Sequence, residues 1–292
     1  MRLITYRSDG GVRHGRLGAD DERSAVDLGE GDLLELLQAG PASLRAAAVA
    51  SGPQVDLDEV TLLAPLRRPP KLLAVAANYA DHIAEGGGSP VDKARIVPKL
   101  FLKPPTTISG PDQPLVLPAV SSTVDWEVEL AAIIGERCRD VPVDEALGKV
   151  AGYTVMNDVS ARTVDYGFPR DTDAGSTFFD WLQGKWCDGF APLGPALVTA
   201  DDVADPQALR LGLRVGGTTH QDGATGDMIF SVAEIIAFAS TLMTLEPGDV
   251  IATGTPAGVG SASGSFLQPE DVMEAWVDGL GVLRTPVEAR RG

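Results

Sequence analysis

Short runs in which apolar and polar residues alternate open the chain. The segments MRLITYR, VRHGRLG and SAVDLG, within residues 1–29, are separated by turn signals such as SDGG, which is typical of short β-strands. Two stretches that follow within residues 31–52, GDLLELLQAG and PASLRAAAVASG, have the spacing of helices. We therefore predict a small N-terminal α+β domain over residues 1–68, which ends at the Arg/Pro cluster LRRPPK.

Short apolar runs dominate residues 69–292, where we place a second domain. The runs that predict strands are KLLAVAANY, LVLPA, WEVELAAIIG, AGYTVMND, ALRLGLRVGG, DVIATGT and DVMEAWVDG. The clearest helices are VDEALGKV and SVAEIIAFASTLMTL. Because 33 glycines and 21 prolines break up many short strands, the pattern favours a mixed, β-rich α/β fold with rolled or sandwiched sheets over a doubly wound sheet.

Charge and composition exclude several classes of function. The chain has 41 acidic and 24 basic residues, and a formal net charge of -17 repels nucleic acid. No run approaches the roughly 20 apolar residues that span a bilayer, and the first residues lack the apolar core of a signal peptide, so we expect a cytoplasmic protein with no membrane partner. Cys138 and Cys187 are expected to be reduced thiols.

Two glutamates interrupt one of the predicted buried strands, DWEVELAAIIG at residues 125–135. Residues two apart in a strand point to the same face, so Glu127 and Glu129 project together while Trp126, Val128 and Leu130 pack behind them. Buried carboxylates are rare unless they are paired or bind a metal. This fragment by itself therefore favours a strand edge that faces solvent.

A third carboxylate changes that interpretation. In AGYTVMNDVSAR an apolar strand ends at Asp158, where strands commonly deliver functional groups. Three converging carboxylates repel one another, and a hard divalent cation with oxygen ligands relieves the repulsion. Glu127, Glu129 and Asp158 together predict a site for Mg²⁺ or Mn²⁺, with Ca²⁺ as an alternative.

Two other segments have candidate functional residues. His82 and Glu85, in NYADHIAEGGG, lie three residues apart and share a face of a short helix, so the glutamate can orient the imidazole as a general base. Most isolated histidines are structural, which is how we interpret His14 and His220. In GTPAGVG, residues 254–260, backbone N–H groups and the Thr255 hydroxyl can bind a carboxylate, whereas the lysine and helix of a phosphate loop are absent.

Six segments in one order resemble the fumarylacetoacetate hydrolase family from about residue 70 to the end. They are NYADHIAE, PKLFLKPPT, DWEVELAAIIG, GYTVMNDVSAR, GKWCDGFAPLGP and SVAEIIAFASTLMTLEPGDVIATGTPAGVG. The resemblance implies a mixed β-roll fold, a homodimer, a lid at the glycine-rich segment, and one metal held by Glu127, Glu129 and Asp158. It also implies an active-site lysine at Lys185 and a substrate contact at Arg162.

Several positions depart from the pattern or leave alternatives open. Asn78 stands where some larger members carry another acidic ligand, which places this chain in a branch with three carboxylates. Asp165 replaces a glutamine, and KWCDGF replaces KSFDTF, so that Cys187 follows close behind Lys185; a packed, unreactive thiol is our interpretation. Most lysines lie on the surface, and Arg162 has an alternative role in an ion pair with Asp158 or Asp165.

The chemistry that the resemblance implies is cleavage or proton transfer next to the carbonyl of a 2-oxo acid or a 1,3-dicarbonyl acid. We favour a metal-dependent hydrolase that cleaves a C–C bond in an acylpyruvate or 2,4-dioxo acid, because His82 and Glu85 supply a base that can activate water. One alternative is an oxaloacetate-type decarboxylase or a 2-hydroxy-dienoate isomerase or hydratase with the same metal site. Another is a non-catalytic protein that senses a metabolite.

Overall fold

The structure, a computed structural model, describes residues 1–18 and 23–290. Over these residues the largest sheet has twelve strands. They are β1 Arg2–Ser8, β2 Gly11–Leu17, β3 Ser24–Glu30, β4 Gln54–Asp56, β5 Thr61–Leu63, β6 Leu72–Ala76, β7 Lys99–Leu102, β8 Ile108–Ser109, β11 Val128–Ile134, β12 Val150–Asn157, β14 Ala191–Thr199 and β17 Val250–Ala252. Their order is β4-β3-β2-β1-β14-β12-β11-β17-β6-β7, with β5 beside β1 and β8 beside β14.

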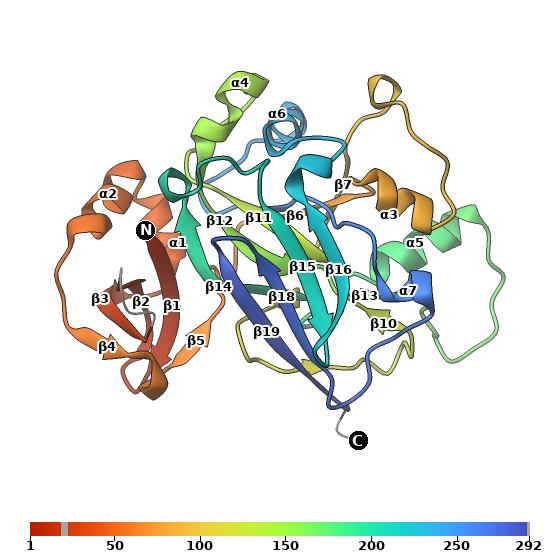
Figure 1. The fold of residues 1–292 in the computed structure, drawn as a ribbon, viewed down its shortest axis with the longest axis horizontal. Helices are drawn as coiled ribbons and strands as arrows, with labels where there is room; N and C mark the ends of the chain where they lie inside the picture. Colours follow the sequence, from red (N-terminus) through yellow and green to blue (C-terminus); the bar gives the residue numbers. More distant parts are fainter. Residues whose placement is uncertain (19–22, 291–292) are drawn as a thin grey trace.

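A second sheet packs across the middle of the first one (Figure 1). Its strands are β9 Leu115–Val116, β15 Arg210–Val215, β16 Thr218–Ala224, β18 Val272–Val277 and β19 Gly281–Glu288, in the order β16-β15-β18-β19-β9. A short pair joins β10 Val124–Asp125 to β13 Ser160–Ala161. Together the two sheets form the mixed, β-rich fold that the sequence predicts.

Short helices surround the sheets (Figure 1). The α-helices are α1 Leu33–Gln38, α2 Pro41–Val49, α3 Ala80–Glu85, α4 Val143–Ala146, α5 Ala174–Gln183, α6 Val232–Leu242 and α7 Gly260–Ser263. The 3₁₀ turns are η1 Leu57–Glu59, η2 Lys93–Arg95, η3 Pro105–Thr107, η4 Leu147–Lys149, η5 Ala200–Asp202 and η6 Thr225–Asp227. None of the helices in the described part of the chain is long and apolar enough to cross a membrane.

The N-terminal segment extends the main sheet. Strand β1 pairs antiparallel with β14, with Arg2 opposite Val198, so β1 to β5 continue the sheet that contains the site. Asp32 caps the N-terminus of helix α1, because its carboxylate accepts a hydrogen bond from the Leu34 amide, and the helix buries Leu33 and Leu37. The domain boundary near residue 68 stays a prediction.

Alternation along β11 determines where the core ends and the site begins. One set of its side chains packs between the two sheets, namely Val128, Leu130, Ala132 and Ile134. Ala131 and Ile133 point to the opposite face, in a second apolar cluster with α1. Glu127 and Glu129 alternate along the strand in step with Ala131 and Ile133, so their side chains point to this second face. They lie at its end, away from the core between the sheets.

Of the helices near the site, α5 was not predicted from the sequence. Asp173 caps its N-terminus by accepting a hydrogen bond from the Ser176 amide, and none of its residues is buried. Its apolar residues Phe178, Trp181 and Leu182 do have helical spacing, but they come at the end of a long acidic segment. In contrast, the predicted helix α6 has a full capping box formed by Ser231 and Glu234.

Candidate active site

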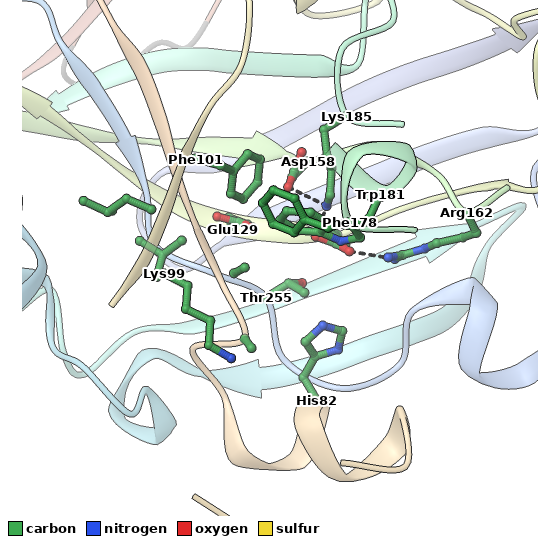
Figure 2. Close-up of a pocket in the computed structure, with 15 residues that line it drawn as sticks. His82, Lys99, Phe101, Glu129, Asp158, Arg162, Phe178, Trp181, Lys185 and Thr255 are labelled. Carbon is green, nitrogen blue, oxygen red and sulfur yellow. Dashed lines mark hydrogen bonds and ion pairs between the residues drawn. The ribbon is translucent and has the colours of Figure 1, made fainter. Parts of the chain in front are cut away.

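A pocket of about 420 Å³ gathers the predicted functional residues (Figure 2). Its lining includes His82, Glu127, Glu129, Asp158, Arg162, Lys185 and Thr255, together with Val75, Ala76, Ala77, Lys99, Leu100, Phe101, Phe178 and Trp181. Glu85 does not line the pocket, but its carboxylate contacts Nδ1 of the pocket residue His82. The pocket therefore brings together residues as far apart in the chain as Val75 and Thr255, which are 180 positions from each other.

The three predicted carboxylates converge. Glu127 directly precedes β11, Glu129 lies within it, and Asp158 directly follows β12. Each offers an oxygen that lies within 4.8 Å of the other two, and all three residues are buried. The Asp158 amide donates to the Glu127 carbonyl oxygen at 2.8 Å, which ties the two strand ends together. The alternative of a strand edge that faces solvent was wrong.

Lys185 lies among these carboxylates. It is 2% exposed, and its Nζ donates to Glu127 Oε2 at 2.8 Å and to Asp158 Oδ2 at 2.7 Å. The preceding Gly184 ends α5 where a Cβ would lie 2.2 Å from the Ala161 carbonyl oxygen, so only glycine lets the chain approach β13 this closely. The alternative of a surface lysine was wrong.

A second buried lysine, Lys103, was missed in the sequence although it belongs to the segment PKLFLKPPT. Its Nζ contacts Asp158 Oδ1 and donates to the Phe190 carbonyl oxygen at 2.9 Å. Phe101 and Lys103 lie two residues apart, so a strand that points one of them into the site points both. This spacing was the signal that could have identified Lys103.

Arg162 has partners other than the two aspartates that we expected. Its Nε donates to Asp125 Oδ1 and its Nη2 donates to Glu127 Oε1, both at 2.6 Å. Asp125, which was not singled out from the sequence, is fully buried and also accepts from the Ser261 amide. Pairing with Asp158 or Asp165 was therefore wrong, and Arg162 holds Glu127 in place while it lines the pocket.

Charges in the cluster leave Glu129 without a cationic partner. Burial alone would raise the pKa of Glu127, but Lys185 and Arg162 outweigh it and hold that pKa well below its usual range. Burial raises the pKa of Glu129 well above its usual value, and the carboxylates of Asp158 and Glu127 raise it further. Among the described residues, no lysine or arginine forms an ion pair with Glu129, whose Oε2 accepts only the Gly254 amide at 2.7 Å.

A divalent cation fits this donor set. Three buried carboxylates with oxygens within 4.8 Å of one another are ligands that hard cations prefer, and the mutual repulsion at Glu129 is what such a cation would relieve. Asn78 does not add a ligand, because its amide donates to the carbonyl oxygens of Phe230 and Thr253 and its oxygen accepts the Phe230 amide. The site therefore matches a branch with three carboxylates.

His82 and Glu85 form the predicted pair on α3. His82 Nδ1 lies 2.8 Å from Glu85 Oε1, and Glu85 Oε2 accepts the Gly258 amide at 2.7 Å. A carboxylate at Nδ1 favours the tautomer in which Nδ1 carries the hydrogen, which leaves Nε2 as the basic atom. Figure 2 shows the His82 ring pointing into the pocket from α3, on the side opposite Asp158 and Lys185.

The hydroxyl and amide groups of the glycine-rich turn around Thr255 form hydrogen bonds to other residues of the protein. The Thr255 hydroxyl donates to the Val128 carbonyl oxygen and accepts from Gln221, both at 2.8 Å. The amides of Gly254 and Gly258 donate to Glu129 and Glu85. This turn therefore positions Glu129 and, through Glu85, helix α3. A substrate contact at Thr255 stays a prediction.

Aromatic side chains form one wall of the pocket. Phe101 and Trp181 meet edge to face with ring centroids 5.1 Å apart, and Lys185 Nζ lies 5.7 Å from the centroid of Phe101. Phe178 and Trp181 come from α5, which explains why an unpredicted helix matters to the site. Cys187 packs partly buried outside this wall, and burial raises the pKa of its thiol, as expected for an unreactive cysteine.

Comparisons with known proteins agree with this geometry. A family model described as fumarylacetoacetate (FAA) hydrolase C-terminal matches residues 71–288, and one described as Rv2993c-like, N-terminal matches residues 1–65. The chain therefore belongs to the fumarylacetoacetate hydrolase family, as the resemblance predicts.

Its relatives include several kinds of enzyme. The mitochondrial oxaloacetate tautomerase FAHD2A of Homo sapiens is 40% identical over 295 residues, which cover 97% of this chain and 90% of the human protein. The structure of fumarylacetoacetate hydrolase from Exiguobacterium antarcticum has a TM-score of 0.81 at 37% identity, with 99% of this chain and 100% of that one covered. The structure of 2-hydroxyhepta-2,4-diene-1,7-dioate isomerase from Mycobacterium marinum has a TM-score of 0.78 at 33% identity and covers both chains fully.

Proposed function

We propose that this enzyme catalyses proton transfer at the carbon next to the carbonyl of a small 2-oxo acid, and that its reaction is the keto–enol tautomerisation of an oxaloacetate-like acid. The observation that supports this most is the His82–Glu85 pair, which faces the same pocket as the carboxylate triad. The name of the human relative, an oxaloacetate tautomerase matched over 97% of this chain, supports the choice of substrate.

Glu127, Glu129 and Asp158 would hold the divalent cation, Mg²⁺ or Mn²⁺ with Ca²⁺ as an alternative. When bound, the cation supplies a Lewis acid that stabilises negative charge on the oxygens of the substrate. His82 Nε2 takes the proton from the carbon next to the carbonyl, and the enolate oxygen takes a proton from water to give the enol. In the reverse direction the enol oxygen gives its proton to water and the charged imidazole returns a proton to the carbon, while Glu85 stabilises the charged imidazole. The Lys185 ammonium, fixed by Glu127 and Asp158, adds positive charge beside the developing enolate.

Hydrolysis of a C–C bond in an acylpyruvate is the second candidate. The same His82–Glu85 pair could instead activate water, and the Exiguobacterium neighbour is a fumarylacetoacetate hydrolase. Decarboxylation of an oxaloacetate-like acid needs the cation and Lys185 but no such base. The three reactions therefore differ in what they release, although they share one site.

A panel of substrates separates these reactions. Oxaloacetate, an acylpyruvate and a 2-hydroxy-dienoate are each incubated with the Mg²⁺-loaded enzyme, and loss of the enol, release of CO₂ and release of acid are measured separately. We expect fast enol loss from oxaloacetate without matching CO₂ or acid. If the main product is the carboxylic acid cleaved from the acylpyruvate, the enzyme is a hydrolase. If the main product is CO₂, the enzyme is a decarboxylase. No turnover of any substrate would support a sensing role.

We also propose that the enzyme is a cytoplasmic homodimer. The chain mass is 30.5 kDa, so light scattering during size exclusion should return about twice that value. A strict monomer with full activity would refute the dimer.

A further inference from the structure

One face of strand β7 connects the carboxylate triad with the outer part of the pocket. Alternate residues of a strand point to the same side, so Lys99 and Phe101 share a face that Lys103 continues directly after the strand. Lys103 contacts buried Asp158 at the inner end, and Phe101 packs against Trp181 along the wall. Lys99 is exposed to solvent and lines the same pocket at its outer end.

Lys99 differs from the other lysine and arginine side chains of the pocket. Lys185 and Arg162 are both paired with buried carboxylates. In the described part of the chain, no carboxylate or other hydrogen-bond acceptor contacts the Lys99 ammonium. A cation without an acidic partner is notable in a chain with 41 acidic and 24 basic residues, and it remains available to an anionic ligand.

The surroundings leave space for a ligand beside this ammonium. Lys99 lies opposite Ala76 in the β6–β7 pairing, and Ala76 and Ala77 both line the pocket with side chains of a single methyl group. In Figure 2 the Lys99 stem extends along the pocket toward the side where His82 lies, on the far side from Arg162. An acid whose reacting end lies at the triad can therefore extend its tail toward Lys99.

We propose that Lys99 is the binding subsite for the second carboxylate of a 2-oxo dicarboxylic acid. This rests on the proposed function, because that function places the 2-oxo end of the substrate at Glu127, Glu129 and Asp158. Lys99 then selects dicarboxylic over monocarboxylic 2-oxo acids through a charge-assisted hydrogen bond. Because the side chain is exposed, its role is recognition of the tail and not proton transfer.

Two pairs of acids that match in chain length test the subsite. Oxaloacetate and 2-oxobutyrate differ in a terminal carboxylate against a methyl group, and NMR follows deuterium exchange at carbon 3 of each. For Lys99→Met we expect the ratio of kcat/KM for oxaloacetate over 2-oxobutyrate to fall roughly tenfold to hundredfold, the range for a hydrogen bond to a charged group. Lys99→Arg should restore most of the ratio.

Lys93→Met is the matched control, because it removes the same charge from a lysine that pairs with Glu234 and does not line the pocket. Its ratio should equal that of the wild type. An unchanged ratio in Lys99→Met, or an equal fall in Lys93→Met, would overturn the subsite.

Binding separates failure of the subsite from failure of the proposed reaction. Calorimetry compares the Kd of 2-oxoglutarate with that of 2-oxopentanoate, using Mg²⁺-loaded wild type and Lys99→Met. If neither acid of the first pair exchanges deuterium, the proposed reaction fails, and the Kd ratio alone decides on Lys99. A preference for 2-oxoglutarate that Lys99→Met abolishes supports the subsite. Equal Kd values in wild type, or no binding of either acid, would overturn it.

Discussion

Replacing His82 by Ala is expected to lower turnover of the oxaloacetate enol about 10² to 10⁴-fold, the usual cost of removing a positioned general base. Metal affinity should remain nearly unchanged, because His82 lies on α3 whereas the proposed ligands come from the ends of β11 and β12. Steady-state kinetics and calorimetric titration with Mg²⁺ measure the two effects in the same preparations. Chemistry and metal binding should therefore separate in this variant.

Two further variants sharpen this result. Glu85→Gln keeps the shape of the partner but removes its charge from His82 Nδ1, so its loss of rate should be smaller than that of His82→Ala. His14→Ala is the control, because His14 lies on β2 in the N-terminal segment, outside the pocket. Undiminished turnover in His82→Ala would eliminate the base. An equal loss of metal binding and turnover would count against a base that is separate from the metal site.

Replacing Glu129 by Gln is expected to weaken metal binding at least about a hundredfold. Loss of a residue that only hydrogen-bonds to a metal ligand already lowers metal affinity roughly tenfold to a hundredfold. In Glu129→Gln a charged ligand itself is lost. Folding should be spared. Burial and two neighbouring carboxylates raise the pKa of Glu129, so in the metal-free wild type its ionisation lowers the free energy of unfolding as pH rises above the ordinary value of 4.5.

Glu129→Gln should remove the pH-dependent loss of unfolding free energy that the ionised Glu129 causes. Above pH 4.5 the metal-free variant should therefore melt at the same or a higher temperature than metal-free wild type. Thermal melting with and without Mg²⁺, together with calorimetry, tests both statements. Glu136→Gln is the matched control, since it makes the same chemical change at a partly exposed residue that pairs with Lys149 and does not line the pocket. Unchanged metal affinity in Glu129→Gln would refute its role as a ligand, and a collapse of folding would show a structural role.

The parts of the site that follow from local geometry could be predicted from the sequence. A period of two puts Glu127 and Glu129 on one face of any strand, and a strand that ends at Asn157 presents Asp158 at its end. The helical spacing of His82 and Glu85 likewise predicts their contact, which the structure has at 2.8 Å. These relations need only the conformation of a short segment.

Contacts between distant segments were beyond such reasoning. Lys103 and Asp158 are 55 residues apart, and Arg162 and Asp125 are 37 apart, so their pairing depends on how the strands assemble. Helix α5 was missed although Phe178, Trp181 and Leu182 have helical spacing, because they end a long acidic segment and the stripe is only a few residues long. The choice among tautomerase, hydrolase and decarboxylase rests on which bond of the substrate breaks: a C–H bond, a C–C bond attacked by water, or the C–C bond to a carboxylate. All three reactions can share these residues.

Conversion of the oxaloacetate enol by metal-depleted protein tests the central claim most directly. The enzyme is treated with a chelator, metal removal is verified by elemental analysis, and loss of enol absorbance is followed before and after addition of Mg²⁺ or Mn²⁺. If the buried triad holds a required cation, the depleted enzyme should show only the spontaneous rate, and either metal should restore turnover. Full activity in protein verified to be free of metal would contradict the account.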